Sequence, residues 1–274
     1  VRDNRGYVVA TAKSEAWAPH YNVLEQQLGA TATLVDIVGQ GVLPTAATWT
    51  GRKFNASGLS PTWTPSEVLS AFDTALVVTD PAKYVGSMPI LTFNGLDESI
   101  TTPDAAYWSR ALAAFSVGAW VWLTDATSSA ILAKYTTVGD LREWVFWLNA
   151  ADKLQLILYD EDVAANPTID TLADVALTQG AWHLVVATYD GTANASGIDL
   201  YIDGVLVAST DTDDAAFVSM RDTTAVVELG KANGASFFDG KMACGPCSPF
   251  FVQAQLTAAQ VKNIFETQRL ALGL

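Results

Sequence analysis

Short runs of apolar, β-branched and aromatic residues, separated by Gly, Asp, Asn and Pro, recur from residue 89 towards the C-terminus. Several of them alternate in character with a period of two residues, as strands do. The expected strands cover residues 90–93, 98–101, 115–123, 130–135, 143–148, 154–160, 182–190, 198–202, 205–210, 225–229 and 241–244. Many short strands with turn residues between them predict an all-β antiparallel sandwich.

Two of these runs are apolar on both faces. In residues 115–123 one face carries Phe115 and every second residue after it, while the other carries Trp120 and Trp122. Residues 143–148 behave similarly, with Trp144 on one face and Trp147 on the other. A strand with one solvated face would alternate with polar residues. We therefore expect both sheet faces to be covered, by the N-terminal segment or a closing helix, by a second subunit, or by sugars stacked on the Trp rings.

The chain is expected to close with a short helix. Thr257 and Gln260 form a capping-box pattern, in which each side chain can satisfy the backbone N–H of the other residue. Val261, Ile264 and Phe265 then recur at helical spacing and should bury one face of the helix.

Residues 1–88 differ from residues 89–274. They are rich in Ala, Thr, Pro and Gly, and only residues 21–28 and 64–72 have the pattern of short helices. Their scattered aromatic residues argue against plain disorder. We expect an extended N-terminal arm, which attaches to or covers another surface, and a separate β domain at residues 89–274.

Residues 180–191 read Gly-Ala-Trp-His-Leu-Val-Val-Ala-Thr-Tyr-Asp-Gly, and residues 198–208 contain Asp203-Gly204 between two apolar runs. An Asp-Gly pair in that position is a strong hairpin signal. Asp190-Gly191 and Asp239-Gly240 predict two further turns. Together these segments resemble the core of laminin-G-like, concanavalin A-like jelly-roll domains. The resemblance extends to residues 91–100, 115–122 and 237–242, and to the closing helix. It implies a concanavalin A-like antiparallel jelly-roll sandwich, a fold that hosts many functions.

The net charge is −14, and it is unevenly placed. Residues 1–88 hold seven acidic and six basic residues, whereas residues 89–274 hold 22 acidic and nine basic ones. Such an acidic domain repels phosphate backbones, which excludes nucleic acid as a partner. No apolar run reaches the roughly 20 residues of a membrane span, so we expect no membrane partner either.

Cys244 and Cys247 are separated by Gly-Pro and spell a thioredoxin-like redox motif. That motif requires a helix directly after the first cysteine, to lower its thiol pKa, and no helical pattern begins before Thr257. We expect buried thiols or a local disulfide. A zinc site would need further ligands, and the only histidines are His20 and His183. We expect His183 to be a hydrogen-bonded structural residue and His20 to lie in a loop.

Acidic residues cluster at Asp160, Glu161 and Asp162, and again at Asp211, Asp213 and Asp214. Alternate carboxylates in a loop can bind Ca²⁺, and laminin-G-like relatives often bind it at the sandwich rim. No fixed ligand motif of that family is present, and the EF-hand pattern fails. A solvated acidic loop is the expectation, with Ca²⁺ as the alternative; no other cofactor is expected.

Glycosidases with the same jelly roll carry an E-x-D-x-x-E strand. None of the eight Glu residues here is followed by Asp two positions later, and no Gly-x-Ser-x-Gly elbow appears. The sequence therefore predicts a protein without enzymatic activity, and a glycoside hydrolase is the weakest of the alternatives. No catalytic, metal-binding or ligand-binding residue can be assigned.

The stretch from residue 240 to 257, with its final helix, resembles laminin-G-like proteins of tailed bacteriophages. The resemblance implies a capsid decoration or tail-associated protein on the virion surface, assembled in the host cytoplasm. Its partners would be other virion proteins, bound through residues 1–88, and also glycans. The resemblance is also compatible with a homo-oligomer. The rival hypothesis is an extracellular lectin-like module, free or at a cell surface.

Overall fold

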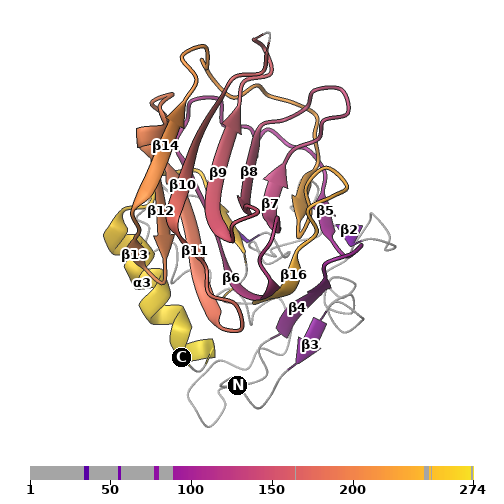
Figure 1. Cartoon of the computed structure of the whole chain (residues 1–274), viewed down its shortest axis with the longest axis vertical. Coiled ribbons are helices and arrows are strands. Elements are labelled where there is room, and N and C mark those ends of the chain that lie inside the picture. The colour runs from indigo at the N-terminus through magenta and orange to yellow at the C-terminus, as the bar shows by residue number, and fades with distance from the viewer. Residues whose placement is uncertain are drawn as a thin grey trace, which may run out of the picture.

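The computed structural model describes residues 34–36, 55–56, 77–79, 89–163, 165–243, 247, 249–272 and 274. Two antiparallel sheets face each other as a sandwich, and one α-helix lies near the C-terminus (Figure 1). The expected all-β sandwich is thereby confirmed. No helix in the described ranges is long and apolar enough to cross a membrane.

The first sheet has nine strands within the described residues. In spatial order seven of them are β13 (Val205–Leu206), β12 (Ile198–Ile202), β11 (Trp182–Tyr189), β6 (Phe115–Asp125), β16 (Asp239–Ala243), β4 (Pro89–Asn94) and β3 (Val77–Thr79). The last two branch from β6: β17 (Phe250–Val252) pairs with β6, and β1 (Leu34–Asp36) pairs with β17.

The second sheet has eight described strands. In spatial order they are β14 (Ser209–Asp213), β10 (Thr168–Ala176), β9 (Lys153–Tyr159), β8 (Trp144–Leu148), β7 (Ala130–Lys134), β15 (Val227–Leu229), β5 (Ile100–Thr102) and β2 (Asn55–Ala56). The pattern in the sequence did not predict β10 or β17. Six of the nine β10 residues are Thr, Asp or Ala, and β17 has only three residues.

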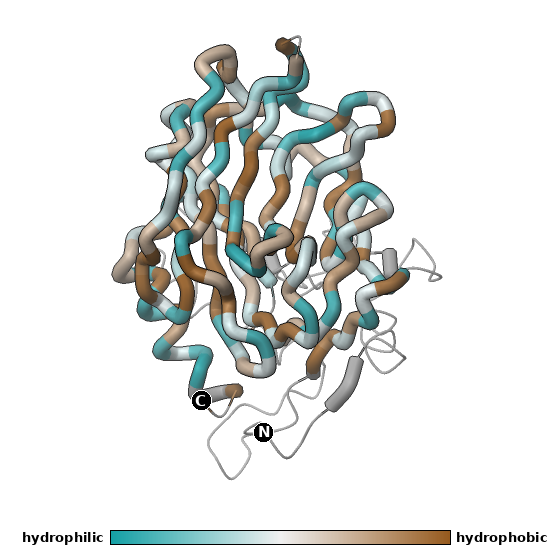
Figure 2. Tube along the Cα trace, in the orientation of Figure 1, coloured by the Kyte–Doolittle hydropathy of each residue, from teal (hydrophilic) through white to brown (hydrophobic). Residues whose placement is uncertain are grey.

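The core lies between the sheets and follows the period of two in the strands. Phe115 and Val117 of β6 point into it, as do Trp144 and Phe146 of β8 and Leu156 of β9. Figure 2 shows apolar and polar residues alternating along several of these strands. The alternation in the sequence therefore assigned the core-facing sides of β6 and β8 correctly.

The three Asp-Gly pairs have different roles. Asp203 and Gly204 have φ values of 52° and 78° and join β12 to β13, as expected for a tight hairpin. Asp190-Gly191 follows the end of β11. The turn expected at Asp239-Gly240 is wrong: these residues begin β16, and a register shift between them marks a bulge against β6.

The expected strand at residues 205–210 is also wrong in its extent. The chain leaves the nine-stranded sheet after Leu206 and joins the eight-stranded sheet at Ser209. Asp211 and Asp213 therefore belong to an edge strand rather than to a loop. Strand-edge carboxylates are a common protection against pairing with other chains.

The closing helix α3 (Ala258–Gln268) is confirmed, with Thr257 as its N-cap and Gln260 completing the capping box. Val261 and Ile264 are buried against the outer face of the nine-stranded sheet. The 3₁₀ segments are η2 (Ala195–Gly197) and η4 (Arg269–Leu272).

Three short strands come from residues 1–88, and each pairs with a strand of the sandwich: β1 with β17, β2 with β5 and β3 with β4. The division into an arm at residues 1–88 and a domain at residues 89–274 stays a prediction. The helices expected at residues 21–28 and 64–72 lie outside the described residues.

Candidate functional site

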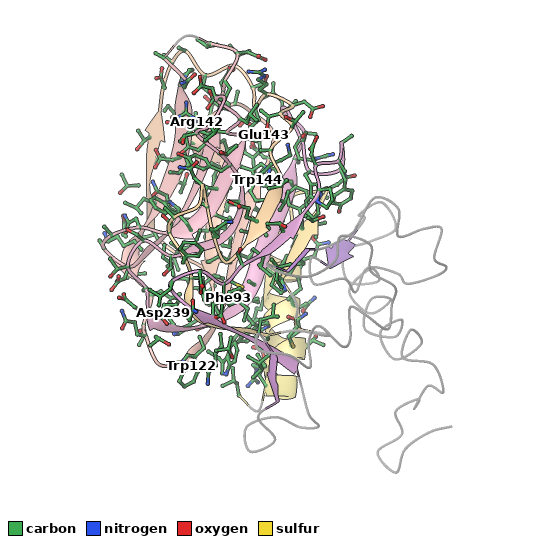
Figure 3. All side chains as sticks on the ribbon, turned by 90° about the vertical axis from the view of Figure 1, so that its right-hand side faces the viewer. Phe93, Trp122, Arg142, Glu143, Trp144 and Asp239 are labelled. Carbon is green, nitrogen blue, oxygen red and sulfur yellow. The ribbon has the colours of Figure 1, made fainter. Side chains whose placement is uncertain are left out.

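The outer faces of the two sheets are covered differently. On the nine-stranded sheet, Trp120 stacks on Phe265 of α3 with ring centroids 5.6 Å apart, and its Nε1 donates to Gln268 Oε1 at 2.8 Å. The closing helix is therefore the cover that the apolar outer face of β6 required. Figures 1 and 3 place α3 on this sheet, away from β8, β9 and β10.

On the eight-stranded sheet, four partly exposed apolar side chains form the outer surface: Tyr135, Trp147, Ile157 and Tyr159. We call this set the aromatic face. Its floor consists of small or medium buried side chains, namely Ala130, Ala133, Val145 and Ala232. Among the described helices, none covers this face.

A chain of hydrogen bonds fixes Trp147. Its Nε1 donates to Gln155 Oε1 at 3.0 Å, and Gln155 Nε2 donates to Asp170 Oδ1 at 2.7 Å. The three residues come from β8, β9 and β10, which are neighbours in the sheet. Burial raises the pKa of Asp170, and the nearby Asp211 carboxylate raises it further. These hydrogen bonds thus fix the orientation of the Trp147 ring.

The second aromatic group lies towards the end of β9. The Tyr135 and Tyr159 rings are 5.2 Å apart, and the Arg142 guanidinium lies 5.5 Å from the centre of the Tyr159 ring. Arg142 also pairs with Glu161: its Nε donates to Oε1, and its Nη2 donates to Oε2 at 3.2 Å. Burial is the main cause that raises the pKa of Tyr159, so its hydroxyl stays protonated and remains a hydrogen-bond donor at neutral pH.

The two carboxylates in the central row of this face, Asp170 and Glu228, are far apart. Register places Asp170, Ile157, Val145, Ala133 and Glu228 in one row across β10, β9, β8, β7 and β15. Four strand spacings separate the two acids by about 19 Å. Glycoside hydrolysis by paired carboxylates requires about 5–9.5 Å. Glu228 is in addition occupied by Lys231, whose Nζ lies 2.9 Å from Oε1.

Carboxylates of the acidic clusters found in the sequence accept hydrogen bonds that hold loops and strands in place. Asp160 Oδ2 accepts from the Val218 and Ser219 backbone N–H groups at 2.9 and 3.1 Å. Asp211 accepts from Thr171 Oγ1 at 2.9 Å, and Asp213 accepts from the Ala195 N–H at 2.6 Å. Within the described ranges, no group of three or more His, Cys, Asp or Glu residues is arranged to hold a metal ion.

The remaining members of these clusters have partners of their own. Glu161 pairs with Arg142, and Asp162 lies 3.5 Å from Arg221. Asp214 accepts from the Ala216 backbone N–H at 2.9 Å. The solvated acidic loop expected at these residues is therefore wrong for Asp160 and Glu161, which are buried.

His183 is hydrogen bonded, as the sequence predicted. Its Nδ1 lies 2.8 Å from Asp203 Oδ2, and Asp203 Oδ1 accepts from the Leu184 N–H at 3.0 Å. The pair thereby fastens the β12–β13 turn to β11. Cys247 is a buried free thiol whose pKa is raised by burial, the opposite of what a redox cysteine needs. Cys244 and His20 lie outside the described residues.

The sequence identified Trp147 as facing outwards but missed its neighbours. Gln155, Ile157 and Tyr159 stand at alternate positions of β9, where Lys, Gln, Ile and Tyr alternate with Leu, and this alternation was a usable signal. Asp170 had no such signal because β10 was not predicted. Only pairing between strands shows that these residues share one face.

Sequence comparison with protein families finds one matching model, described as the concanavalin A-like lectin/glucanases superfamily, over residues 94–244. No curated protein sequence matches the chain.

Several solved structures are similar in fold. Domain 4 of an extracellular arabinanase from Geobacillus stearothermophilus, solved with arabinotriose, has a TM-score of 0.47 and 19% identity, over 70% of this chain and 82% of that one. The CBM40 of an IT-sialidase from Ruminococcus gnavus has a TM-score of 0.46 and 18% identity, over 64% and 97%. The receptor-binding domain of a botulinum neurotoxin mosaic of serotypes C and D has a TM-score of 0.49 and 13% identity, over 71% and 46%.

The family match spans more than half of the chain and coincides with the sandwich described above. The chain therefore belongs to the concanavalin A-like lectin/glucanase superfamily.

Proposed function

We propose that this protein is a non-enzymatic carbohydrate-binding protein, and that the aromatic face of its eight-stranded sheet holds the glycan. The observation that carries the proposal is Trp147, a partly exposed indole fixed by the Gln155–Asp170 hydrogen bonds on a sheet face that no described helix covers.

The chemistry of the face suits a sugar. Ligand sites combine apolar and aromatic surface with a few placed polar groups. Trp147, Tyr135 and Tyr159 offer ring surface for the C–H groups of a pyranose, and the small floor residues Ala133 and Val145 allow a flat ligand to approach the sheet. Gln155 and Asp170 supply hydrogen-bonding atoms beside the Trp147 ring.

The same face argues for binding without hydrolysis. The two acids of its central row, Asp170 and Glu228, are about 19 Å apart at the strand spacing of a sheet. Each also has a partner, Gln155 in one case and Lys231 in the other. A glycoside hydrolase is therefore the less favoured function.

The test begins with affinity electrophoresis against a panel of soluble polysaccharides, followed by calorimetry with the retained one. Trp147→Ala should weaken binding at least tenfold, which corresponds to about 1.4 kcal/mol. Trp122→Ala is the matched control, because Trp122 is also partly buried but lies on the outer side of the other sheet. Retention of no polysaccharide, or equal losses in the two variants, contradicts the proposal.

We place this glycan-binding domain on the surface of a bacteriophage virion, either as a capsid decoration protein or near the tail. Support comes from the sequence resemblance at residues 240–257 and from the contrast in charge between residues 1–88 and residues 89–274. A nearly neutral arm can approach an acidic neighbour that repels the domain. An extracellular lectin-like module is the alternative. Co-purification with particles, and labelling by electron microscopy, separate the two.

A further inference from the structure

A charged cluster lies on the core side of the eight-stranded sheet, on the opposite side from the aromatic face. The Lys134 side chain is completely buried. Its Nζ lies 2.5 Å from Glu143 Oε1, 3.0 Å from Asp104 Oδ1 and 2.5 Å from the Thr223 carbonyl oxygen. Glu143 is also completely buried, whereas the Asp104 side chain is 31% exposed. Two carboxyl groups, those of Glu143 and Asp104, thus contact the side-chain nitrogen of Lys134.

The surroundings of this cluster are apolar. Register places Lys134 between Trp144 of β8 and Val227 of β15, and both of these side chains belong to the core. Figure 3 shows Glu143 next to Trp144. Apolar surroundings disfavour the charged forms of amines and carboxyl groups, and they exclude the water that would hydrate them.

Glu143 is arranged to move a proton. Its Oε1 accepts from Ser109 Oγ at 3.1 Å and from the Thr223 N–H at 2.6 Å, in addition to Lys134. Its Oε2 is buried and has no hydrogen-bond partner among the described residues. Burial raises the pKa of Glu143, although Lys134 and Thr223 oppose the shift. One oxygen therefore contacts the ammonium group while the other is free to carry a proton.

We infer that Lys134 and Asp104 condense into an intramolecular isopeptide bond, with Glu143 as the proton relay. Glu143 takes a proton from the Lys134 ammonium group, and the neutral amine attacks Cγ of Asp104. A C–N bond forms, a C–O bond of the carboxyl group breaks, and the departing oxygen leaves as water after receiving protons from Glu143 and from the attacking nitrogen. The ammonium and the carboxylate are thereby replaced by one neutral amide and one water molecule.

The fixed position of the two groups favours a fast reaction. Lys134 Nζ is already in contact with Asp104 Oδ1, the oxygen bonded to the attacked Cγ, and such fixed proximity raises effective concentrations by many orders of magnitude. The product removes the charge of the buried Lys134 ammonium group and that of the partly exposed Asp104 carboxylate beside it. It also fastens the segment after β5 to the end of β7, which closes a loop of the chain and limits its freedom in the unfolded state, as a disulfide does.

The test is the intact mass of the full chain, measured under denaturing conditions after purification and prolonged incubation. We expect the wild-type chain to be lighter than its sequence mass by one water molecule. A protease digest should contain a branched peptide that joins the segments around Asp104 and Lys134. Asp104→Ala and Glu143→Gln should both have the full sequence mass.

Two controls make the result decisive. Succinimide formation at Asp190-Gly191, Asp203-Gly204 or Asp239-Gly240 also removes one water, but it reverses in mild alkali and persists in Asp104→Ala. Far-UV circular dichroism verifies that Asp104→Ala, which removes a partly exposed carboxylate, remains folded. A wild-type chain of full mass, or a loss of water that persists in folded Asp104→Ala, overturns the inference.

Discussion

At the scale of single residues, partly buried polar groups on the outer face of the eight-stranded sheet are hydrogen bonded to one another. Asp170 accepts a hydrogen bond from Gln155, which in turn accepts one from Trp147. The carboxylate is half-buried, and burial raises its pKa above the ordinary value of 3.8. Asp170 therefore orients the Trp147 ring through Gln155, and its ionisation lowers the stability of the folded state.

This effect of ionisation predicts a pH dependence of stability. Because the folded state holds the Asp170 proton more tightly than the unfolded state, the contribution of Asp170 to stability falls as pH rises above about 4. Asp170→Asn keeps an acceptor for Gln155 and removes the titration. Urea unfolding at about pH 4 and pH 7 should show a smaller loss of stability with rising pH in Asp170→Asn than in the wild type. Asp174→Asn, an exposed carboxylate on the same strand, is the control and should behave as the wild type does.

At the scale of elements, the β12–β13 hairpin is held against α3. Gly204 has φ of +78°, and a Cβ atom built there would lie 2.9 Å from Phe265 Cβ and 3.2 Å from Lys262 Cα. The hairpin can approach the helix this closely because position 204 has no side chain. The left-handed backbone of the turn and the close packing against α3 thus both favour glycine at position 204.

Two glycine substitutions separate these effects. Gly180 has a similar φ of +73°, but nothing lies within 4 Å of its added Cβ. Gly180→Ala should cost only the left-handed backbone strain, about 1–2 kcal/mol. Gly204→Ala should cost that amount and a further 1–3 kcal/mol or so for overpacking against α3. Chemical denaturation measures both. Equal losses would mean that the hairpin does not depend on the helix.

At the scale of the whole molecule, the core between the sheets is built from one continuous region. Its described members run from Leu91 to Phe251, and α3 closes the outer face of one sheet. Strands β1, β2 and β3 pair with β17, β5 and β4.

Residues 89–274 alone should therefore fold and melt cooperatively, and they should lose attachment to particles. The physical reason is that the larger segment buries its own apolar surface, while residues 1–88 offset their chain entropy only against another surface. Calorimetry tests whether the truncated chain melts cooperatively. A particle-binding assay tests whether it has lost attachment. The full chain is the reference in both. If the truncated chain is unfolded, residues 1–88 must form part of the core. A folded product that still binds particles would place attachment in the jelly roll.

The sequence by itself determined the features that depend on local spacing. The period of two in β6 and β8 defined their core-facing sides, because successive side chains of a strand point to opposite faces. The capping box at Thr257 and Gln260 and the Asp203-Gly204 turn were also predictable, because their partners lie within four residues along the chain.

Only the tertiary structure decided which apolar face is covered and which polar groups meet. Both β6 and β8 have apolar outer residues, but α3 packs over Trp120 and not over Trp147. Lys134, Glu143 and Asp104 come from separate segments, and no local pattern indicates that they share one buried site. These outcomes depend on strand order and on the path of the chain between sheets. Both follow from the burial of the whole apolar surface rather than from any single stretch of sequence.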